Sequence, residues 1–223
     1  MTKKLRFIIL LIFVFIFALA TPLVILRAQG YQFDLEEKKL INTGGIFLKS
    51  TPGKASIYLN NKILKVQTPA IISRLIPGKY FVSLELDGFY SWQKKLVIEP
   101  NMIVKQDSIL LLPKEPKLIQ INKLPEITVQ KENKLNYNNH EIWLESGEDE
   151  KEIKLITRYA EPIKQAFLYK DHEHVVFLVG DQVKFIELYG TNIVDFIKAD
   201  KIFYQDNKLF VEISNNWFVL DEL

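Results

Sequence analysis

The feature that most constrains this chain is an uninterrupted apolar run near its amino terminus. Residues 7 to 26, FIILLIFVFIFALATPLVIL, carry no charge, and basic residues stand on both sides of them. At about 1.5 Å per residue, a helix of this length matches a hydrocarbon core of about 30 Å. The core helix of a soluble domain would have a polar face, which this run lacks. Residues 1–27 are therefore predicted to form a short cytoplasmic tail and a single-pass transmembrane anchor.

A cleaved signal peptide is the alternative to this anchor. Ala18-Leu19-Ala20 has the small-x-small pattern that signal peptidases accept, and the mature chain would then begin at Thr21. Against cleavage, Pro22 stands just beyond that site and the apolar run continues to Leu26. We therefore expect the anchor to remain.

The topology prediction depends on chain length more than on charge. Three basic residues precede the span and Arg27, Lys38 and Lys39 follow it, so the positive-inside bias is slight. A short tail before a long exported portion is the simpler arrangement. The expected localisation is the cell membrane, with a cytoplasmic amino terminus and extracytoplasmic carboxyl-terminal domains.

The rest of the chain indicates an all-β fold. Residues 28–43 are polar without a strong period and are expected to form a stalk. From residue 44 to 112 apolar and polar residues alternate with period two, as in KYFVSLEL, which is the pattern of half-buried strands. No segment of this region has helical spacing over ten residues. Turn-forming pairs separate the expected strands: Pro52-Gly53, Asn60-Asn61, Thr68-Pro69, Pro77-Gly78 and Asp87-Gly88.

This order of turns resembles the PEGA domain family over residues 44–112. Pro52-Gly53-Lys54-Ala55 stands at the place of the name-giving motif and departs from it, whereas the later elements fit better. These are the threonine-proline pair, the Leu75-x-Pro-Gly-x-Tyr80 turn and the glycine-aromatic pair at residues 88–89. The resemblance implies a small β-sandwich, common in bacterial and archaeal envelope proteins, without known catalytic residues. Its motif residues are expected to shape turns.

Residues 113–126 contain three prolines and are expected to form a Pro-rich linker that does not continue a sheet. Residues 127–223 then repeat a strand-turn-strand pattern, in which Tyr137, Tyr169 and Tyr204 take matching places. This region resembles blades of a β-propeller, whose meanders repeat at about 40 residues. Three copies are fewer than a closed propeller needs. We expect either an open meander or part of a longer propeller, with an exposed strand edge that self-associates or binds a partner.

Few residues suggest chemistry. His172 and His174 alternate as strand ligands would, and His140 occupies the equivalent turn of the first repeat, but a polar turn explains them better than a metal site does. The acidic cluster at residues 148–152 lacks the ligand spacing of a calcium loop and is expected to be a solvated hairpin tip. Tyr90 and Trp92 are expected in the core rather than in a sugar-binding platform.

Composition excludes further classes. The chain has no cysteine, which excludes disulfides, thiolate zinc sites and cysteine nucleophiles. The chain has 29 basic and 27 acidic residues, and the basic residues do not cluster into a stripe. We therefore expect no nucleic-acid partner. No catalytic, cofactor or metal residue is assigned. The prediction is a non-enzymatic, membrane-anchored envelope protein that acts as a scaffold or recognises protein or cell-wall glycan. The alternative is a metal-dependent enzyme or sensor with its site in the carboxyl-terminal repeats.

Overall fold

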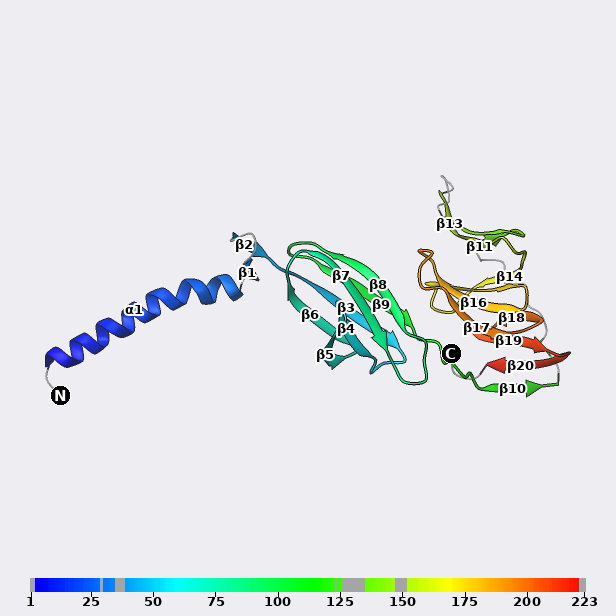
Figure 1. Ribbon diagram of the computed structural model, residues 1–223, viewed down its shortest axis with the longest axis horizontal. Helices are drawn as coiled ribbons and strands as arrows, with labels where there is room; N and C mark the ends of the chain where they lie inside the picture. The colour runs from blue at the N-terminus through cyan, green and yellow to red at the C-terminus, as the bar shows by residue number, and fades with distance from the viewer. Residues whose placement is uncertain are drawn as a thin grey trace.

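The protein is an extended, mostly β molecule with three parts in a row: a helix, a β-sandwich and a group of β meanders (Figure 1). The computed structural model describes residues 3–28, 30–34, 39–122, 124–125, 135–146 and 152–220. The predicted all-β fold behind one amino-terminal helix is confirmed.

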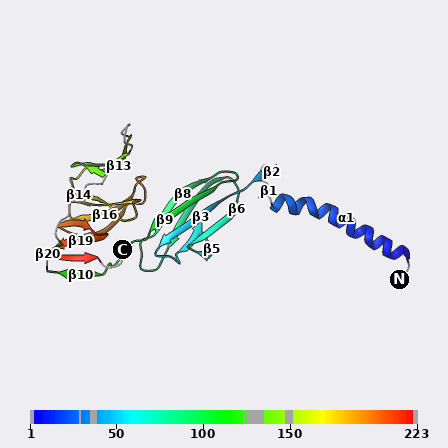
Figure 2. The same ribbon diagram turned by 180° about the vertical axis from the view of Figure 1, so that it is seen from behind.

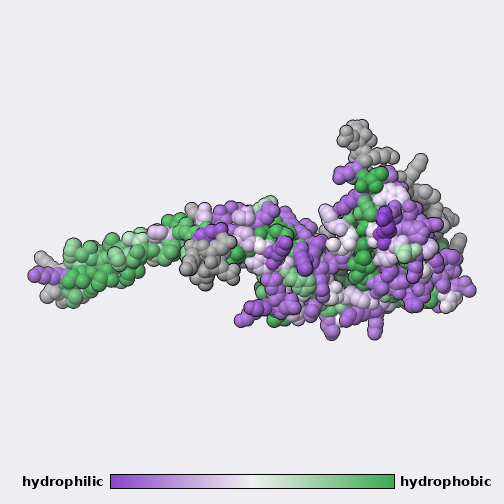
Figure 3. Space-filling view, turned by 45° about the horizontal axis from the view of Figure 1, so that its top comes forward, coloured by the Kyte–Doolittle hydropathy of each residue, from purple (hydrophilic) through white to green (hydrophobic). Residues whose placement is uncertain are grey.

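The amino-terminal helix α1 spans Lys3–Ala28 and packs against nothing along most of its length. Its apolar side chains form a continuous hydrophobic surface (Figure 3). Pro22 lies inside the helix, and the Thr21 hydroxyl donates to the carbonyl of Phe17 at 2.7 Å. The expected apolar helix is confirmed, and by length and composition it can cross a membrane. A signal sequence has the same properties.

A small hairpin follows the helix, where the sequence predicted an irregular stalk. Strand β1 (Tyr31–Asp34) pairs antiparallel with β2 (Lys39–Asn42). Thr43, which is buried, then ties this junction together, because its backbone N–H and its hydroxyl both donate to the Gly30 carbonyl, at 3.0 and 2.8 Å. Strands β1 and β2 and Thr43 are therefore held by backbone pairing that a periodicity argument could not detect.

The sandwich consists of two sheets that cover one apolar core. One sheet has the order β6-β3-β9 and the other β5-β4-β7-β8, and all pairs are antiparallel except β3 with β9. Alternate residues of these strands point inward, among them the fully buried Ile46, Leu48, Ile57 and Leu84. The strands are β3 (Gly44–Thr51), β4 (Ser56–Leu59), β5 (Lys62–Gln67), β6 (Ala70–Leu75), β7 (Gly78–Glu85), β8 (Trp92–Ile98) and β9 (Ile103–Leu110).

The turns of the sandwich form where the sequence placed them. Asn60 and Asn61 join β4 to β5 with φ of 48° and 64°, as a two-residue hairpin of the predicted kind requires. Thr68 has a different role. Its hydroxyl is buried, accepts the N–H of Ala55 at 3.0 Å and lies 2.6 Å from the Ser50 hydroxyl. The threonine-proline pair therefore joins the start of β4 to the end of β3.

The carboxyl-terminal region contains three antiparallel meanders. Their orders are β11-β12-β13, then β14-β15-β16-β17, then β18-β19-β20 with β10 added beside β20. Their bounds are β10 (Leu118–Ile121), β11 (Leu135–Tyr137), β12 (Glu141–Ser146), β13 (Glu152–Arg158), β14 (Ile163–Leu168), β15 (His174–Val179), β16 (Gln182–Glu187), β17 (Val194–Lys198), β18 (Lys201–Gln205), β19 (Lys208–Ile213) and β20 (Asn216–Leu220). Tyr137 and Tyr204 lie in the first strands of their meanders, as predicted, whereas Tyr169 is the residue directly after β14.

The predicted Pro-rich linker holds a strand, contrary to the expectation that it would not join a sheet. Residues 118–121 form β10, which lies along β20 in both views (Figures 1 and 2). The three prolines fall outside these four residues, so the backbone N–H groups of β10 remain available for pairing.

Strand β15 lies between two cores, which explains its uninterrupted apolar sequence. Val175, Phe177 and Val179 face the core shared with the first meander, whereas Val176 and Leu178 face the core shared with the third. All six residues of β15 are buried. The prediction that this run would be covered on both faces is confirmed.

Candidate functional site

The sandwich and the meanders meet in an interdomain joint, formed by residues 88–94 and 111–114 on one side and 187–192 on the other. Leu111 packs into the sandwich core, and the next residue, Leu112, packs into the core of the meanders. In the same way, Phe89 packs against the sandwich core and its neighbour Tyr90 packs against the core of the meanders. Because successive residues of an extended chain point to opposite sides, these two segments contribute to both cores at once.

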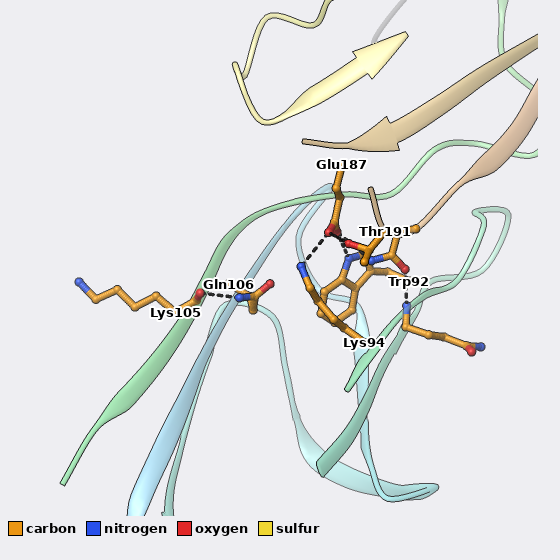
Figure 4. A network of polar contacts seen from close by, with 8 residues as sticks. Trp92, Lys94, Lys105, Gln106, Glu187 and Thr191 are labelled. Atoms are coloured by element: carbon orange, nitrogen blue, oxygen red, sulfur yellow. Dashed lines mark hydrogen bonds and ion pairs between the residues drawn. The ribbon is translucent and has the colours of Figure 1, made fainter. Parts of the chain in front are cut away.

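Glu187, the last residue of β16, lies at the centre of the joint and is 7% exposed. Its Oε1 accepts from Trp92 Nε1 at 2.6 Å and from Asn192 Nδ2 at 2.9 Å. Its Oε2 accepts from Lys94 Nζ at 2.7 Å and from Thr191 Oγ1 at 2.6 Å (Figure 4). Two of these donors belong to β8 of the sandwich, and the other two belong to the loop after β16. One carboxylate therefore connects the two domains.

The environment of Glu187 favours its charged form. Burial raises the pKa of this carboxyl group, but the hydrogen bonds from Lys94, Thr191 and Trp92 outweigh burial, so the pKa lies below its ordinary value of 4.5. The lysine ammonium also lies 6.0 Å from the Trp92 ring centre and 5.7 Å from that of Tyr189, where the electron-rich ring faces attract a cation.

A cleft of about 450 Å³ opens beside this network. Residues 105–109 of β9 line one wall, and Glu173, His174, Glu187 and Tyr189 line the other. Strand β9 stands at the end of its sheet among the described strands, and its Lys105 carbonyl accepts from the Gln106 side chain at 2.7 Å (Figure 4). The cleft combines carboxylates, an ammonium group and an exposed aromatic ring, which can hydrogen-bond and stack with a polar ligand.

His174, the first residue of β15, lines this cleft and holds the preceding turn in place. It is buried, and its Nδ1 lies 2.7 Å from Asp171 Oδ2. The other Asp171 oxygen accepts the N–H groups of Glu173 and His174 at 2.9 and 3.0 Å. Burial raises the pKa of Asp171, but these bonds outweigh it, and the pKa lies below its ordinary value. The sequence had suggested the polar turn that is found here.

The structure does not bring the three histidines into one site. His172 lies in the turn with φ of 57° and donates its backbone N–H to Tyr169, whereas His140 belongs to the first meander and has its Nδ1 3.1 Å from the Tyr159 carbonyl. Across the described parts of the chain, no three His, Asp or Glu side chains lie close enough together to hold a metal ion.

The other candidates from the sequence are the acidic cluster at residues 148–152 and the aromatic residues Tyr90 and Trp92. Residues 148–151 of the acidic cluster lie outside the described residues, and Glu152 begins β13. Trp92 is 3% exposed in the sandwich core, which confirms the prediction for that residue, and Tyr90 packs partly buried against the core of the meanders.

Sequence reasoning missed Glu187 and its donors. One signal was present: in QVKFIELYG, Val183 and Phe185 point into the core, and Glu187 takes the next inward place. A carboxylate in that register must find hydrogen-bond donors when the strand is buried. The sequence could not show that the donors come from β8.

Comparison with known protein families identifies one domain of this chain. Residues 43–110 match the model of the PEGA domain family, which confirms the resemblance predicted for residues 44–112. No similar sequence was found among curated proteins. The likeness of the carboxyl-terminal meanders to propeller blades stays a prediction. A PEGA domain behind an apolar amino-terminal helix fits a membrane-anchored or secreted, non-catalytic module.

Proposed function

We propose that this protein is a membrane-anchored, non-catalytic component of the cell envelope. Its exported part is a rigid two-domain unit that acts as a scaffold or as a recognition surface for a protein or cell-wall glycan. The observation that carries the proposal is the buried Glu187 network, which connects the PEGA domain to the meanders through Trp92 and Lys94.

Rigidity matters because domains of one chain move relative to each other unless their interface is extensive. Here a charged group is buried at the interface with four hydrogen bonds, and two chain segments contribute to both cores. Separating the domains would remove Leu112 from the core of the meanders and leave Glu187 without the two donors Trp92 and Lys94. Such a unit keeps its binding cleft in one shape.

We propose that the helix remains as an anchor, because the apolar run continues beyond Ala20 to Leu26 and Pro22 stands just after the possible cleavage site. Helix α1 continues without a break through Ala18–Ala20, and the junction that follows it is bound to the sandwich side through Thr43. Protease treatment of intact spheroplasts, with sequencing of the mature amino terminus, tests this. We expect a membrane-bound chain whose carboxyl-terminal domains are digested. A soluble product that begins at Thr21 would contradict the anchor.

The meanders support a propeller-like arrangement. Their first strands β11, β14 and β18 are neighbours in space, and the last meander receives its fourth strand, β10, from a distant segment. The outer strand β13 has no neighbour on its far side among the described strands, and its Ile153 and Leu155 are exposed. We propose that this edge docks a partner or a second copy.

Two experiments separate the proposal from a metal-dependent enzyme or sensor. A pull-down on cell-envelope fractions with the full chain in detergent should recover a protein or glycan, and the Glu187→Gln variant should recover less because the cleft loses its shape. Asp195→Asn, which removes an exposed ion pair with Lys184, is the matched control. Stoichiometric zinc, copper or nickel in elemental analysis of purified protein would favour the alternative.

A further inference from the structure

A second hollow lies at the opposite end of the sandwich, where α1 ends. It measures about 620 Å³. Leu23, Leu26 and Arg27 of the helix form one wall, and Phe33 and Leu40 of the hairpin and Arg74 of β6 complete it. We call this hollow the junction groove. It contains an apolar part and two arginines.

Arg74 is placed in this groove by an unusual backbone conformation. In the β3–β6 pairing, Gly44 is opposite Leu75 and Gly45 is opposite Ser73, so Arg74 is the extra residue of a β-bulge. Its φ is 62°, in the left-handed region that disfavours side chains with a Cβ. Bulges turn a side chain in a new direction, often next to functional sites. Residues held in this conformation occur at ligand-binding sites, which makes Arg74 a candidate for a functional role.

The residues of α1 that line the groove determine the depth at which the groove would lie in a membrane. If Phe7 to Leu26 occupy the hydrocarbon core, Arg27 lies in the headgroup layer of the leaflet that faces the domains. Leu23, which is 68% exposed, then lies beside the acyl chains, and Phe33 and Leu40, both about half exposed, lie just above it. Neither Arg27 nor Arg74 forms an ion pair within the described part of the chain.

The junction is ordered enough to hold such a groove. The Gly30 carbonyl receives both donors of Thr43, and the Thr43 carbonyl accepts the N–H of Asn101 at 3.0 Å. These bonds connect the end of the helix, the hairpin and the sandwich. The arginine from the helix and the arginine from the bulge are therefore held on the same hollow.

We propose that the junction groove binds the headgroup of an anionic phospholipid from the surrounding membrane. Arginine guanidinium groups pair with phosphate oxygens through two parallel hydrogen bonds, and Arg27 and Arg74 supply two such groups. One acyl chain would lie along Leu23 and Leu26. A zwitterionic lipid fits less well, because the positive charge of its ammonium group offsets the attraction between its phosphate and the two guanidinium groups. This inference rests on the proposed membrane anchor.

The test uses the full chain in nanodiscs that contain phosphatidylglycerol and phosphatidylcholine in equal amounts. Native mass spectrometry after release from the nanodisc measures which lipid stays bound. We expect phosphatidylglycerol to dominate. Each arginine should contribute about fivefold to this preference, as for a basic side chain near an anionic surface. Arg27→Gln and Arg74→Gly should each reduce the preference by that factor, and Lys65→Gln, an exposed cation outside the groove, should not.

Arg74→Gly separates lipid binding from folding. Because glycine adopts positive φ freely, this variant should unfold at the same temperature as the native chain or above it, while its lipid preference falls. Undiminished preference in Arg74→Gly, or equal retention of both lipids by the native chain, would overturn the lipid site and leave the anchor intact. Displacement of the lipid by an equal concentration of inorganic phosphate would also overturn it. A mature chain that begins at Thr21 would remove the anchor and the inference together.

Discussion

Replacing Glu187 by glutamine removes the negative charge from the interdomain joint and keeps a side chain of nearly the same size. The glutamine carbonyl can still accept from Trp92 and Asn192, but its NH₂ group then faces the ammonium of Lys94 and the hydroxyl of Thr191. Breaking a buried ion pair costs about 3–5 kcal/mol. The Lys94 side chain is 19% exposed and can recruit water, so we expect a loss of about 2–3 kcal/mol in the free energy of unfolding.

Urea unfolding of the detergent-solubilised chain, followed by tryptophan fluorescence, measures this loss. A double-mutant cycle with Lys94→Met isolates the pair, and we expect a coupling energy of about 1.5–3 kcal/mol. Asp195→Asn, in an ion pair whose carboxylate is 63% exposed, should cost about 1 kcal/mol or less. Coupling below about 0.5 kcal/mol between Glu187 and Lys94 would refute the view that this carboxylate connects the domains.

The pH dependence follows from the lowered pKa of Glu187. Since its pKa is below 4.5 in the folded protein and near that value in the unfolded chain, its contribution is fully present above about pH 4.5. The contribution is lost as pH falls through the folded-state pKa. The lowered pKa of Asp171 acts in the same direction, so the difference between the native chain and Glu187→Gln isolates the joint. Parallel stability curves for the two proteins below pH 4.5 would contradict the assignment.

Three further predictions concern the sandwich and the strand edge. Gly88 has φ of 79° and open space at its Cβ position, so Gly88→Ala should cost about 1 kcal/mol from the backbone alone, whereas Gly53→Ala should be nearly neutral in the same thermal unfolding assay. Thr68→Val removes a buried hydroxyl and should cost about 1–3 kcal/mol, with Thr68→Ser recovering most of it. Sedimentation of the full chain in detergent should show self-association or partner binding that Ile153→Lys or Leu155→Lys abolishes; a monomer unaffected by either change would contradict the open edge.

Local patterns in the sequence determined much of the architecture. The charge-free run predicted α1 because a membrane-length apolar helix has few alternatives. Alternation with period two predicted the strands of the sandwich, and Asn60-Asn61 predicted its first hairpin because asparagine tolerates positive φ. Each of these inferences depends on residues within one turn or one strand of each other, where backbone sterics and side-chain spacing act directly.

Only the tertiary structure decided which distant segments meet. Strand β10 could have paired with any open edge, and its alternation does not specify β20. In the sequence, Glu187 at the end of a strand resembles a solvent-exposed residue. In the structure it is buried and accepts a hydrogen bond from Trp92, 95 positions earlier. The bulge that directs Arg74 depends on the register of β6 against β3. Burial of a charge or strain at one residue is tolerated only when distant groups compensate for it, and those groups are brought close by the fold as a whole.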